Sequence, residues 1–365
     1  KFSARSNSYP APNRTNLMAK THFGSDNVSG IAPEILDAIA RANHGGVDSY
    51  GGDDVTASLE KSFGDIFETE VSVLPVGTGT IANCLAVSFV APPWGAVYCH
   101  RDSHIMVDEA NGPEFFSGGA KLADLPGDHG RLDPVTVRAA ATAFDADDVH
   151  HPMRAALSIT QATEWGTLYS LDQVRELGTV AGKLGMDFHM DGARFANAIA
   201  AMGCTPAELT WKAGVDVLSF GATKNGCLAV EALVVFGAKR KQFGTLRRLH
   251  KRAGQLYSKM RFFSTQLDAY LADNNWLSWA GHANAQAKRL SEGLCEADGV
   301  DLLHPVEANE IFLSLPESVF IAMQATGFGF YPIASAGDGT GTIRLVTAFD
   351  TDPADVETLI AAAKG

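Results

Sequence analysis

The sequence has few cysteines, and their arrangement excludes two common classes of protein. Five of the 365 residues are cysteine, they lie far apart, and no C-x-x-C pair occurs among them. Small disulfide-stapled domains and cysteine-rich zinc sites need paired, closely spaced cysteines. The cysteine usage therefore predicts a protein of a reducing compartment, with the cytoplasm as its default location, and the sequence indicates no metal site.

Long runs of basic or of apolar residues are also missing. No stretch of lysine and arginine is long enough to follow a phosphate backbone, and the formal net charge is -13 at pH 7, so nucleic acid is not expected as a partner. No uninterrupted apolar stretch could span a bilayer, and the polar first 20 residues lack the apolar core of a secretory signal. A membrane is therefore not expected as a partner either.

What the sequence does contain is an alternation of short apolar runs with longer segments of helical period. This pattern is typical of a parallel sheet covered by helices. The runs expected to form strands are residues 71–76, 96–99, 155–159, 186–190, 215–220 and 229–236. Between them, a helix with a single apolar face is expected to begin at Leu171. The pattern predicts an α/β fold for this part of the chain.

After about residue 255 the pattern changes. A long helix across 260–271 is expected there, followed by short strands near 310–315 and 342–349 and by a terminal helix capped at Asp352. These elements predict a second, α+β domain. The predicted division is an irregular N-terminal arm over residues 1–20, a large α/β domain over 21–255 and a small domain over 256–365.

Lys224 is the first candidate for chemistry. It stands in Ser-Phe-Gly-Ala-Thr-Lys-Asn-Gly (219–226), directly after an expected strand and between two glycines. Loops at strand ends hold catalytic groups in α/β folds, and a lysine partly removed from water loses proton affinity, which makes its amine available to form a Schiff base. Alone, the segment is a weak indication, because a lysine after a strand is more often a solvated surface residue.

Asp191 is the second candidate. The segment His-Met-Asp-Gly-Ala-Arg-Phe-Ala-Asn-Ala (189–198) places it where an expected strand ends. A site for pyridoxal 5′-phosphate (PLP) would give this carboxylate a partner, because the pyridine nitrogen must stay protonated for the ring to act as an electron sink. A helix cap or a turn is the plainer explanation of Asp191 alone. Asp191 and Lys224 together are more specific, and the pair favours PLP.

A turn rich in glycine and threonine is the third candidate. The segment Pro-Val-Gly-Thr-Gly-Thr-Ile-Ala-Asn (75–83) lies between an expected strand and an amphipathic helix, with Thr78, Gly79 and Thr80 at its centre. Backbone amides, threonine hydroxyls and the helix dipole there could bind a phosphate, whereas the lysine of the nucleotide-binding consensus is absent. The turn could also hold no ligand, and only its combination with Asp191 and Lys224 favours a PLP phosphate.

With these three segments, the chain resembles the low-specificity L-threonine aldolases and, more closely, the phenylserine aldolases, from about Phe23 to the C-terminus. The other shared segments are Ser-Asp-Asn (25–27), Tyr-Gly-Gly-Asp (50–53), Ser-His-Ile (103–105), Gly-Pro-Glu-Phe-Phe-Ser (112–117), Thr-Gln-Ala-Thr-Glu (160–164) and Ile-Arg-Leu-Val-Thr (343–347). The resemblance implies the aspartate-aminotransferase-like fold of PLP enzymes, fold type I, with a mostly parallel seven-stranded sheet in the large domain and a small α+β C-terminal domain.

The resemblance also implies how the cofactor is held. Lys224 would carry PLP as a Schiff base, Asp191 would pair with the pyridinium, and the 78–80 segment would bind the phosphate. His104 would stack on the pyridine ring, although a histidine is more often a hydrogen-bonded structural residue. Arg194 would lie near the cofactor oxygen or near the substrate carboxylate.

A second set of residues would bind the substrate. Ser25 and Arg344 would hold its carboxylate, which agrees with the expectation that an arginine inside the apolar segment 343–347 needs an anionic partner. Tyr50 would border the substrate. His150 matches the histidine near the β-hydroxyl and is the candidate proton acceptor; a second histidine follows it, so the alignment within this pair is open.

The resemblance implies an activity as well. The enzyme would cleave L-β-hydroxy-α-amino acids, such as threonine, allo-threonine and phenylserine, into glycine and an aldehyde, and it would be a homo-oligomer whose site is completed across a dimer, commonly within a tetramer. A PLP-dependent aminotransferase or β-eliminating lyase shares the lysine, the aspartate and the phosphate loop, so it stays open. A PLP-binding regulatory domain would normally carry a DNA-reading module and a basic surface, and this sequence has neither.

Overall fold

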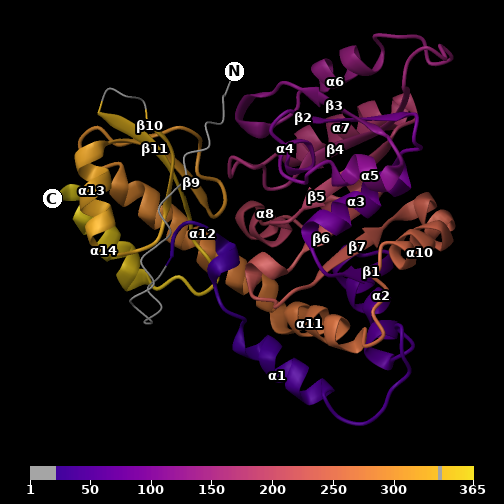
Figure 1. Cartoon of the computed structure of the whole chain (residues 1–365), viewed down its shortest axis with the longest axis horizontal. Helices are drawn as coiled ribbons and strands as arrows, with labels where there is room; N and C mark the ends of the chain where they lie inside the picture. Colours follow the sequence, from indigo (N-terminus) through magenta and orange to yellow (C-terminus); the bar gives the residue numbers. More distant parts are fainter. Residues whose placement is uncertain (1–21, 336–338) are drawn as a thin grey trace.

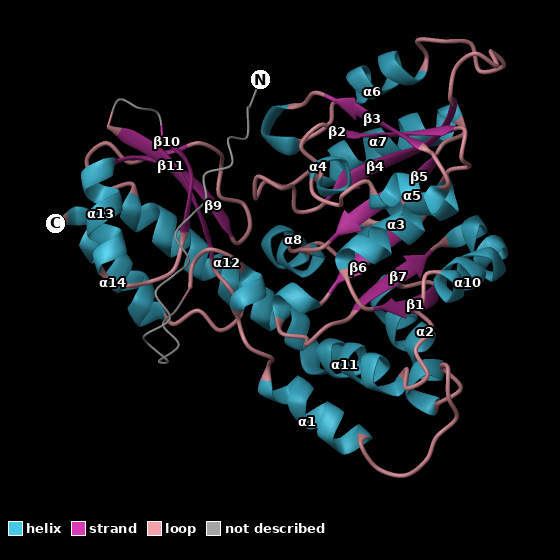
Figure 2. Cartoon of the chain, in the orientation of Figure 1, coloured by secondary structure: helices cyan, strands magenta, loops and turns pink. Residues whose placement is uncertain are grey.

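Two sheets organise the chain, and helices cover both (Figures 1 and 2). The computed structural model describes residues 22–335 and 339–365, so the predicted arm over residues 1–20 lies outside the described part. The larger sheet has seven strands in the order β1-β7-β6-β5-β4-β2-β3, and the smaller has four in the order β10-β11-β9-β8. The α/β fold with a separate small sheet is as predicted.

The larger sheet is mostly parallel. Its strands are β1 (Ser72–Val76), β2 (Gly95–His100), β3 (Lys121–Leu125), β4 (Met153–Thr160), β5 (Asp187–Gly192), β6 (Val217–Gly221) and β7 (Glu231–Val235). The pairs from β6 across to β3 are parallel, and β7 alone runs antiparallel to its neighbours. The sequence did not predict β3, a short edge strand with one exposed lysine and one exposed aspartate that break its apolar pattern.

Helices lie on both faces of this sheet (Figure 2). The helices between residues 33 and 252 are α1 (Pro33–Ala42), α2 (Asp54–Phe67), α3 (Gly79–Val90), α4 (His104–Val107), α5 (Gly112–Ser117), α6 (Pro134–Ala141), α7 (Leu171–Leu184), α8 (Phe195–Met202), α9 (Pro206–Leu209) and α10 (Phe243–Arg252). Helix α7 begins at Leu171, as predicted, because Ser170 and Gln173 form a capping box there.

Successive residues of the central strands enter two different cores, as the pleat requires. Val217 and Leu233 are buried with residues of α3 and α10. Leu218 and Val234, which follow them in the chain, are buried in a larger cluster with residues of α2, α7, α8 and α11 (Arg261–Leu271). Burial on both faces explains why these strands are continuous apolar runs in the sequence.

The C-terminal part forms the smaller sheet. Its elements are α12 (Asn275–Leu294), β8 (Asp301–Leu302), β9 (Glu310–Pro316), α13 (Glu317–Ala325), β10 (Tyr331–Ser335), β11 (Thr340–Val346) and α14 (Pro353–Lys364). The helix predicted across 260–271 begins one residue later and ends where Asp273 and Asn274 adopt positive φ, before α12 starts. Helix α11 packs on α1 and α2, and α12 packs on α8 and α14; the predicted boundary between residues 255 and 256 stays a prediction.

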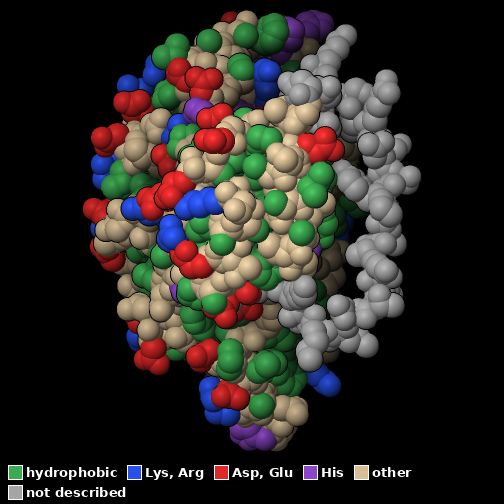
Figure 3. Space-filling model, turned by 90° about the vertical axis from the view of Figure 1, so that its left-hand side faces the viewer, with side chains coloured by type: hydrophobic (Ala, Val, Ile, Leu, Met, Phe, Trp, Pro, Cys, Tyr) green, Lys and Arg blue, Asp and Glu red, His purple; other side chains and the backbone are tan. Residues whose placement is uncertain are grey.

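The surface of the described ranges shows no single dominant charge on the face in Figure 3, where acidic and basic side chains are interspersed. Among residues 22–335 and 339–365, no helix is both long and apolar enough to cross a membrane.

Candidate active site

The carboxyl ends of β4, β5 and β6 meet the N-terminus of α3 at a cavity of about 350 Å³. Carboxyl ends of parallel strands lie at one edge of a sheet, so residues far apart in sequence converge there. Seven residues predicted from the sequence line this cavity: Thr78, Gly79, Thr80, His104, Asp191, Arg194 and Lys224.

The loop that carries Lys224 is held on both sides. Before it, the N–H of Ala222 donates to Glu231 Oε2 at 2.6 Å, and burial raises the pKa of Glu231 to about 7. After it, Asn225 Nδ2 donates to the Tyr270 hydroxyl and to the Trp276 carbonyl at 2.7 and 2.8 Å. The Lys224 amine itself makes no hydrogen bond or ion pair within the described ranges, so the backbone is fixed while the amine stays available at the cavity.

Asp191 lies buried at the end of β5, with 3% of the residue exposed. Its Oδ2 accepts a hydrogen bond from Asn83 Nδ2 at 2.8 Å, and its Oδ1 accepts one from the N–H of Ala193 at 3.0 Å. Asn83 comes from α3, so the carboxylate is fixed between the strand end and the helix. A buried carboxylate at a cavity wall needs a cationic partner, and the cavity is where that partner can bind.

His189 supports this strand end from within the sheet. Its Nδ1 lies 2.9 Å from Ser158 Oγ on β4 and its Nε2 lies 3.0 Å from Ser219 Oγ on β6, so the ring bridges both neighbours of β5. Burial lowers the pKa of His189 to about 4. The ring is therefore neutral at physiological pH.

We expect the substitution His189→Gln to reduce the acid sensitivity of the fold. Because burial lowers the pKa of His189 from 6.5 to about 4, its stabilising contribution is complete above pH 6.5 and is lost as the pH falls through this window, where the unfolded chain binds the proton first. The window corresponds to roughly 3 kcal/mol. Denaturant unfolding at several pH values should show the difference between parent and variant changing by this amount.

The start of α3 is built to receive an anion. Thr78 caps the helix, and its Oγ1 accepts a hydrogen bond from the N–H of Ile81 at 3.2 Å. The first N–H groups of a helix have no partner inside it, and a side chain added at Gly79 would meet open space. At Gly77 a Cβ would lie 2.7 Å from the Tyr257 hydroxyl, so a larger residue there would have to displace that side chain. The geometry suits a phosphate.

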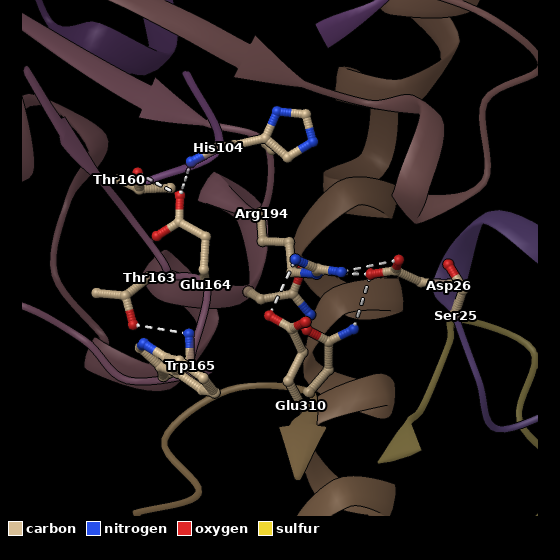
Figure 4. A network of polar contacts seen from close by, with 12 residues as sticks. Ser25, Asp26, His104, Thr160, Thr163, Glu164, Trp165, Arg194 and Glu310 are labelled. Carbon is tan, nitrogen blue, oxygen red and sulfur yellow. Dashed lines mark hydrogen bonds and ion pairs between the residues drawn. The ribbon is translucent and has the colours of Figure 1, made fainter. Parts of the chain in front are cut away.

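His104 forms another wall of the cavity. Its Nδ1 lies 2.7 Å from Glu109 Oε1, and its backbone N–H donates to Glu164 Oε1 at 2.7 Å (Figure 4). Glu164 Oε1 also accepts a hydrogen bond from the Thr160 hydroxyl at 2.8 Å. The hydrogen bond to Glu109 raises the pKa of His104, and burial raises the pKa of Glu164 to about 7. Two buried carboxyl groups therefore hold this histidine.

Arg194 lies at the centre of a buried ion cluster (Figure 4). Its Nε and Nη2 donate to the two carboxylate oxygens of Asp26 at 2.7 and 3.0 Å, and its Nη1 lies 2.9 Å from Glu310 Oε2. Asn309 Nδ2 also donates to Asp26, at 3.1 Å. Three segments far apart in sequence are thereby joined at the cavity, and its contacts with the described residues leave N–H groups of Arg194 that a ligand could bind.

Four predicted residues do not line the cavity. Arg344 on β11 donates from Nη2 to the Gly24 carbonyl at 3.0 Å, and Ser25 accepts the N–H of Asn27 at 3.1 Å, so both lie beside the Asp26 cluster. Tyr50 is 53% exposed and contacts Lys251. His150 is exposed in the loop before β4, at the end of that strand opposite to the cavity. Within one chain, neither Tyr50 nor His150 is brought to the site.

Several polar residues of the site were missed at the sequence level, among them Asn83, Glu109, Glu164 and Glu231. Asn83 lies at the end of the glycine-threonine segment, so its place one turn into α3 was an available signal. Glu231 is brought to the site by the pairing of β6 with β7, and Glu109, five residues after His104, belongs to no motif that marks it. The burial of such carboxyl groups and their contacts are known only from the folded structure.

The site fits PLP, because one cavity presents a lysine amine, a buried carboxylate and a helix N-terminus. Fold and site together define a PLP-dependent enzyme of fold type I. The chain belongs to the beta-eliminating lyase family, whose model matches residues 22–318.

Known proteins of similar sequence and structure agree with this assignment. The chain is 43% identical to a low specificity L-threonine aldolase of a Pseudomonas species, over 93% of this chain and 96% of that protein. It is 42% identical to the low specificity L-threonine aldolase of Pseudomonas aeruginosa, over 90% and 93% of the two chains. The solved structure of Leishmania major threonine aldolase matches with a TM-score of 0.88 and 27% identity, over 94% of this chain and 99% of that chain.

Proposed function

We propose that this PLP-dependent carbon-carbon lyase cleaves L-β-hydroxy-α-amino acids, including threonine, allo-threonine and phenylserine, into glycine and an aldehyde, in the cytoplasm. The observation that carries the proposal is the convergence of Lys224, Asp191 and the α3 N-terminus on one cavity. The choice of reaction is supported by the similarity to threonine aldolases over nearly the whole chain. The alternatives of the same fold, transamination and β-elimination, use the same three features.

The roles of the residues follow from their positions. Lys224 would hold the cofactor and release it to the substrate amine, and Asp191 would keep a proton on the pyridine nitrogen. The bound cofactor supplies an electron sink for the carbon-carbon bond that breaks. Thr78, Gly79 and Thr80 would bind its phosphate, and His104 would lie against its ring.

The substrate carboxylate would be bound beside the Asp26 cluster. Arg344 and Ser25 lie next to this cluster, and Arg194 has unused donors in the cavity. A carboxylate fixed here would aim the Cα–Cβ bond relative to the cofactor and so select which bond breaks.

We expect Arg344→Ala to raise the KM for threonine by roughly 10- to 100-fold, the value of one to two charge-assisted hydrogen bonds, and to slow turnover as well. Steady-state kinetics on the purified variant check this. Arg289, which pairs with Glu357 on the surface, is the control, and Arg289→Ala should leave KM unchanged. An unchanged KM in Arg344→Ala would remove Arg344 from the site.

His150 and Tyr50 retain a role only if another subunit completes the site. We therefore propose a homo-oligomer, with a dimer as the smallest active unit and a tetramer as the expected assembly. In that arrangement His150 stays the candidate acceptor of the β-hydroxyl proton.

Product analysis tests the function directly. The purified enzyme is incubated with PLP and with threonine, allo-threonine, phenylserine or β-hydroxyaspartate, and glycine and aldehyde are quantified. Equal amounts of glycine and aldehyde from at least one substrate are expected. A keto acid with consumption of an amino acceptor would indicate an aminotransferase, ammonia would indicate β-elimination, and glycine from none of the four would refute the aldolase.

A further inference from the structure

A buried chain of hydrogen bonds connects two opposite parts of the site. Asn83 Nδ2 donates both to Asp191 Oδ2 and to Glu109 Oε1, each at 2.8 Å. Glu109 Oε1 in turn lies 2.7 Å from His104 Nδ1. These hydrogen bonds therefore run from Asp191 through Asn83 and Glu109 to His104. Asp191 lies at the end of β5, Asn83 lies on α3 and His104 lies on α4.

Burial of Asn83 and Glu109, the middle residues of this hydrogen-bond series, costs free energy. The side chain of Glu109 has 0% exposure and Asn83 is 2% exposed. Glu109 Oε2 and Asn83 Oδ1 are buried without a hydrogen-bond partner in the described part of the chain. A carboxylate so enclosed needs a cation, and the ring of His104 is the group in contact with it that can become one. Structure alone gives no reason to place an ionisable group there, since an apolar residue would fill the space without these costs.

We propose that Glu109 is a positioning residue of the site, which holds the proton of His104 on Nδ1 and, through Asn83, joins His104 to Asp191. The protonation of the His104 imidazole and that of the pyridine nitrogen therefore depend on each other. The catalytic part of this inference rests on the proposed function. A carboxylate that accepts a hydrogen bond from Nδ1 of a histidine fixes both the tautomer and the orientation of the imidazole.

The charges around His104 agree with this assignment. The hydrogen bond to Glu109 is the largest influence that raises the pKa of His104, and Asp191 raises it further, whereas burial and Lys224 lower it. Glu164 contacts the backbone N–H of His104 and not its ring. Around Glu109, burial raises the pKa of the carboxyl group, the hydrogen bonds from His104 and Asn83 act against it, and the charge of Asp191 raises it further. Glu109 is thus the carboxylate in direct contact with the ring.

The first test measures His104 in the protein without cofactor. Nitrogen-detected NMR titration follows the ring, which His104→Phe identifies by the loss of its signals, and His250, bonded to the Pro75 carbonyl, serves as the internal reference. In the parent, His104 should be protonated more readily than an ordinary histidine and should keep its proton on Nδ1 when neutral. A ring that is protonated less readily than an ordinary histidine overturns the proposal without any variant.

Glu109→Gln then separates charge from shape, because glutamine keeps an acceptor oxygen but carries no charge. The ratio of protonated to neutral His104 at fixed pH should fall about tenfold. The matched control is Glu114→Gln, which removes another carboxylate with a buried unpartnered oxygen that makes no bond to His104. A change of less than about twofold in Glu109→Gln, or an equal change in the control, contradicts the proposal.

The link through Asn83 is tested with the holoenzyme. Glu109→Gln should shift the pH dependence of the cofactor's visible absorbance, and this shift should disappear in an Asn83→Ala background, as a double-mutant cycle requires for coupled residues. Equal shifts in both backgrounds would show that the two ends are independent. Neither readout needs aldol cleavage, so absent glycine formation with these titrations intact would refute the proposed function and leave the role of Glu109 standing.

Discussion

Replacing Lys224 by alanine should reduce turnover by at least about four orders of magnitude, since no other group in the site can take over the covalent step. The fold should persist, because the loop is held by Ala222 and Asn225 and the lysine side chain contributes no hydrogen bond within residues 22–335 and 339–365. Asp191 and the α3 N-terminus should still bind PLP noncovalently, which equilibrium dialysis would detect.

Reductive trapping identifies the residue directly. Borohydride treatment of the parent holoenzyme, followed by peptide mass mapping, should mark Lys224, and the Lys224→Ala protein should stay unlabelled. Lys212→Ala is the control, because Lys212 pairs with Glu68 on the surface and should be neither labelled nor needed. A label on another lysine would refute the assignment.

Asp191→Ala is also expected to lose activity, by roughly 100- to 1000-fold, the loss measured when a preorganised electrostatic partner of a reacting group is removed. Without the carboxylate, nothing in contact with the pyridine nitrogen would keep it protonated, and a neutral ring is a poor electron sink. The same substitution leaves Asn83 Nδ2 with one acceptor instead of two.

Two measurements separate chemistry from structure in this variant. Circular dichroism and the unfolding midpoint report whether the strand end survives, and the cofactor spectrum reports the protonation of the ring. Asp191→Asn is the companion variant, since it keeps the volume and the bond to Ala193 but removes the charge. Near-normal turnover in either variant would mean that another group protonates the ring.

Most of the fold could be predicted from sequence, because the buried parallel strands are continuous apolar runs and the helices carry their own caps. Capping at Ser170 and Asp352 fixed two helix starts to the residue. The edge strand β3 was missed because exposure interrupts its pattern. Helix α12 was not predicted as a separate element, because positive φ angles at Asp273 and Asn274 separate it from α11 and spacing does not reveal them.

The site residues that could be predicted from the sequence are those marked by their position at the end of an expected strand. Asp191 lies at the end of β5 and Lys224 lies in the loop after β6, so the order of elements brings them to one edge of the sheet. Arg194 was predicted near the cofactor or the substrate carboxylate, but its two carboxylate partners come from segments more than 100 residues away in sequence. Glu109 lies only five residues after His104, and it was missed because its role depends also on Asn83 and Asp191, which folding brings next to it.

The ion cluster of Asp26, Arg194 and Glu310 also bears on how the molecule comes apart. It joins the first described segment, the end of β5 and the start of β9, and the side chains of Asp26 and Glu310 are each 1% exposed. Pulling the small sheet away would leave buried charges without partners, at a cost of roughly 3–5 kcal/mol. The two sheets should therefore melt in a single cooperative transition, and amide exchange in β9 should be as slow as in β5.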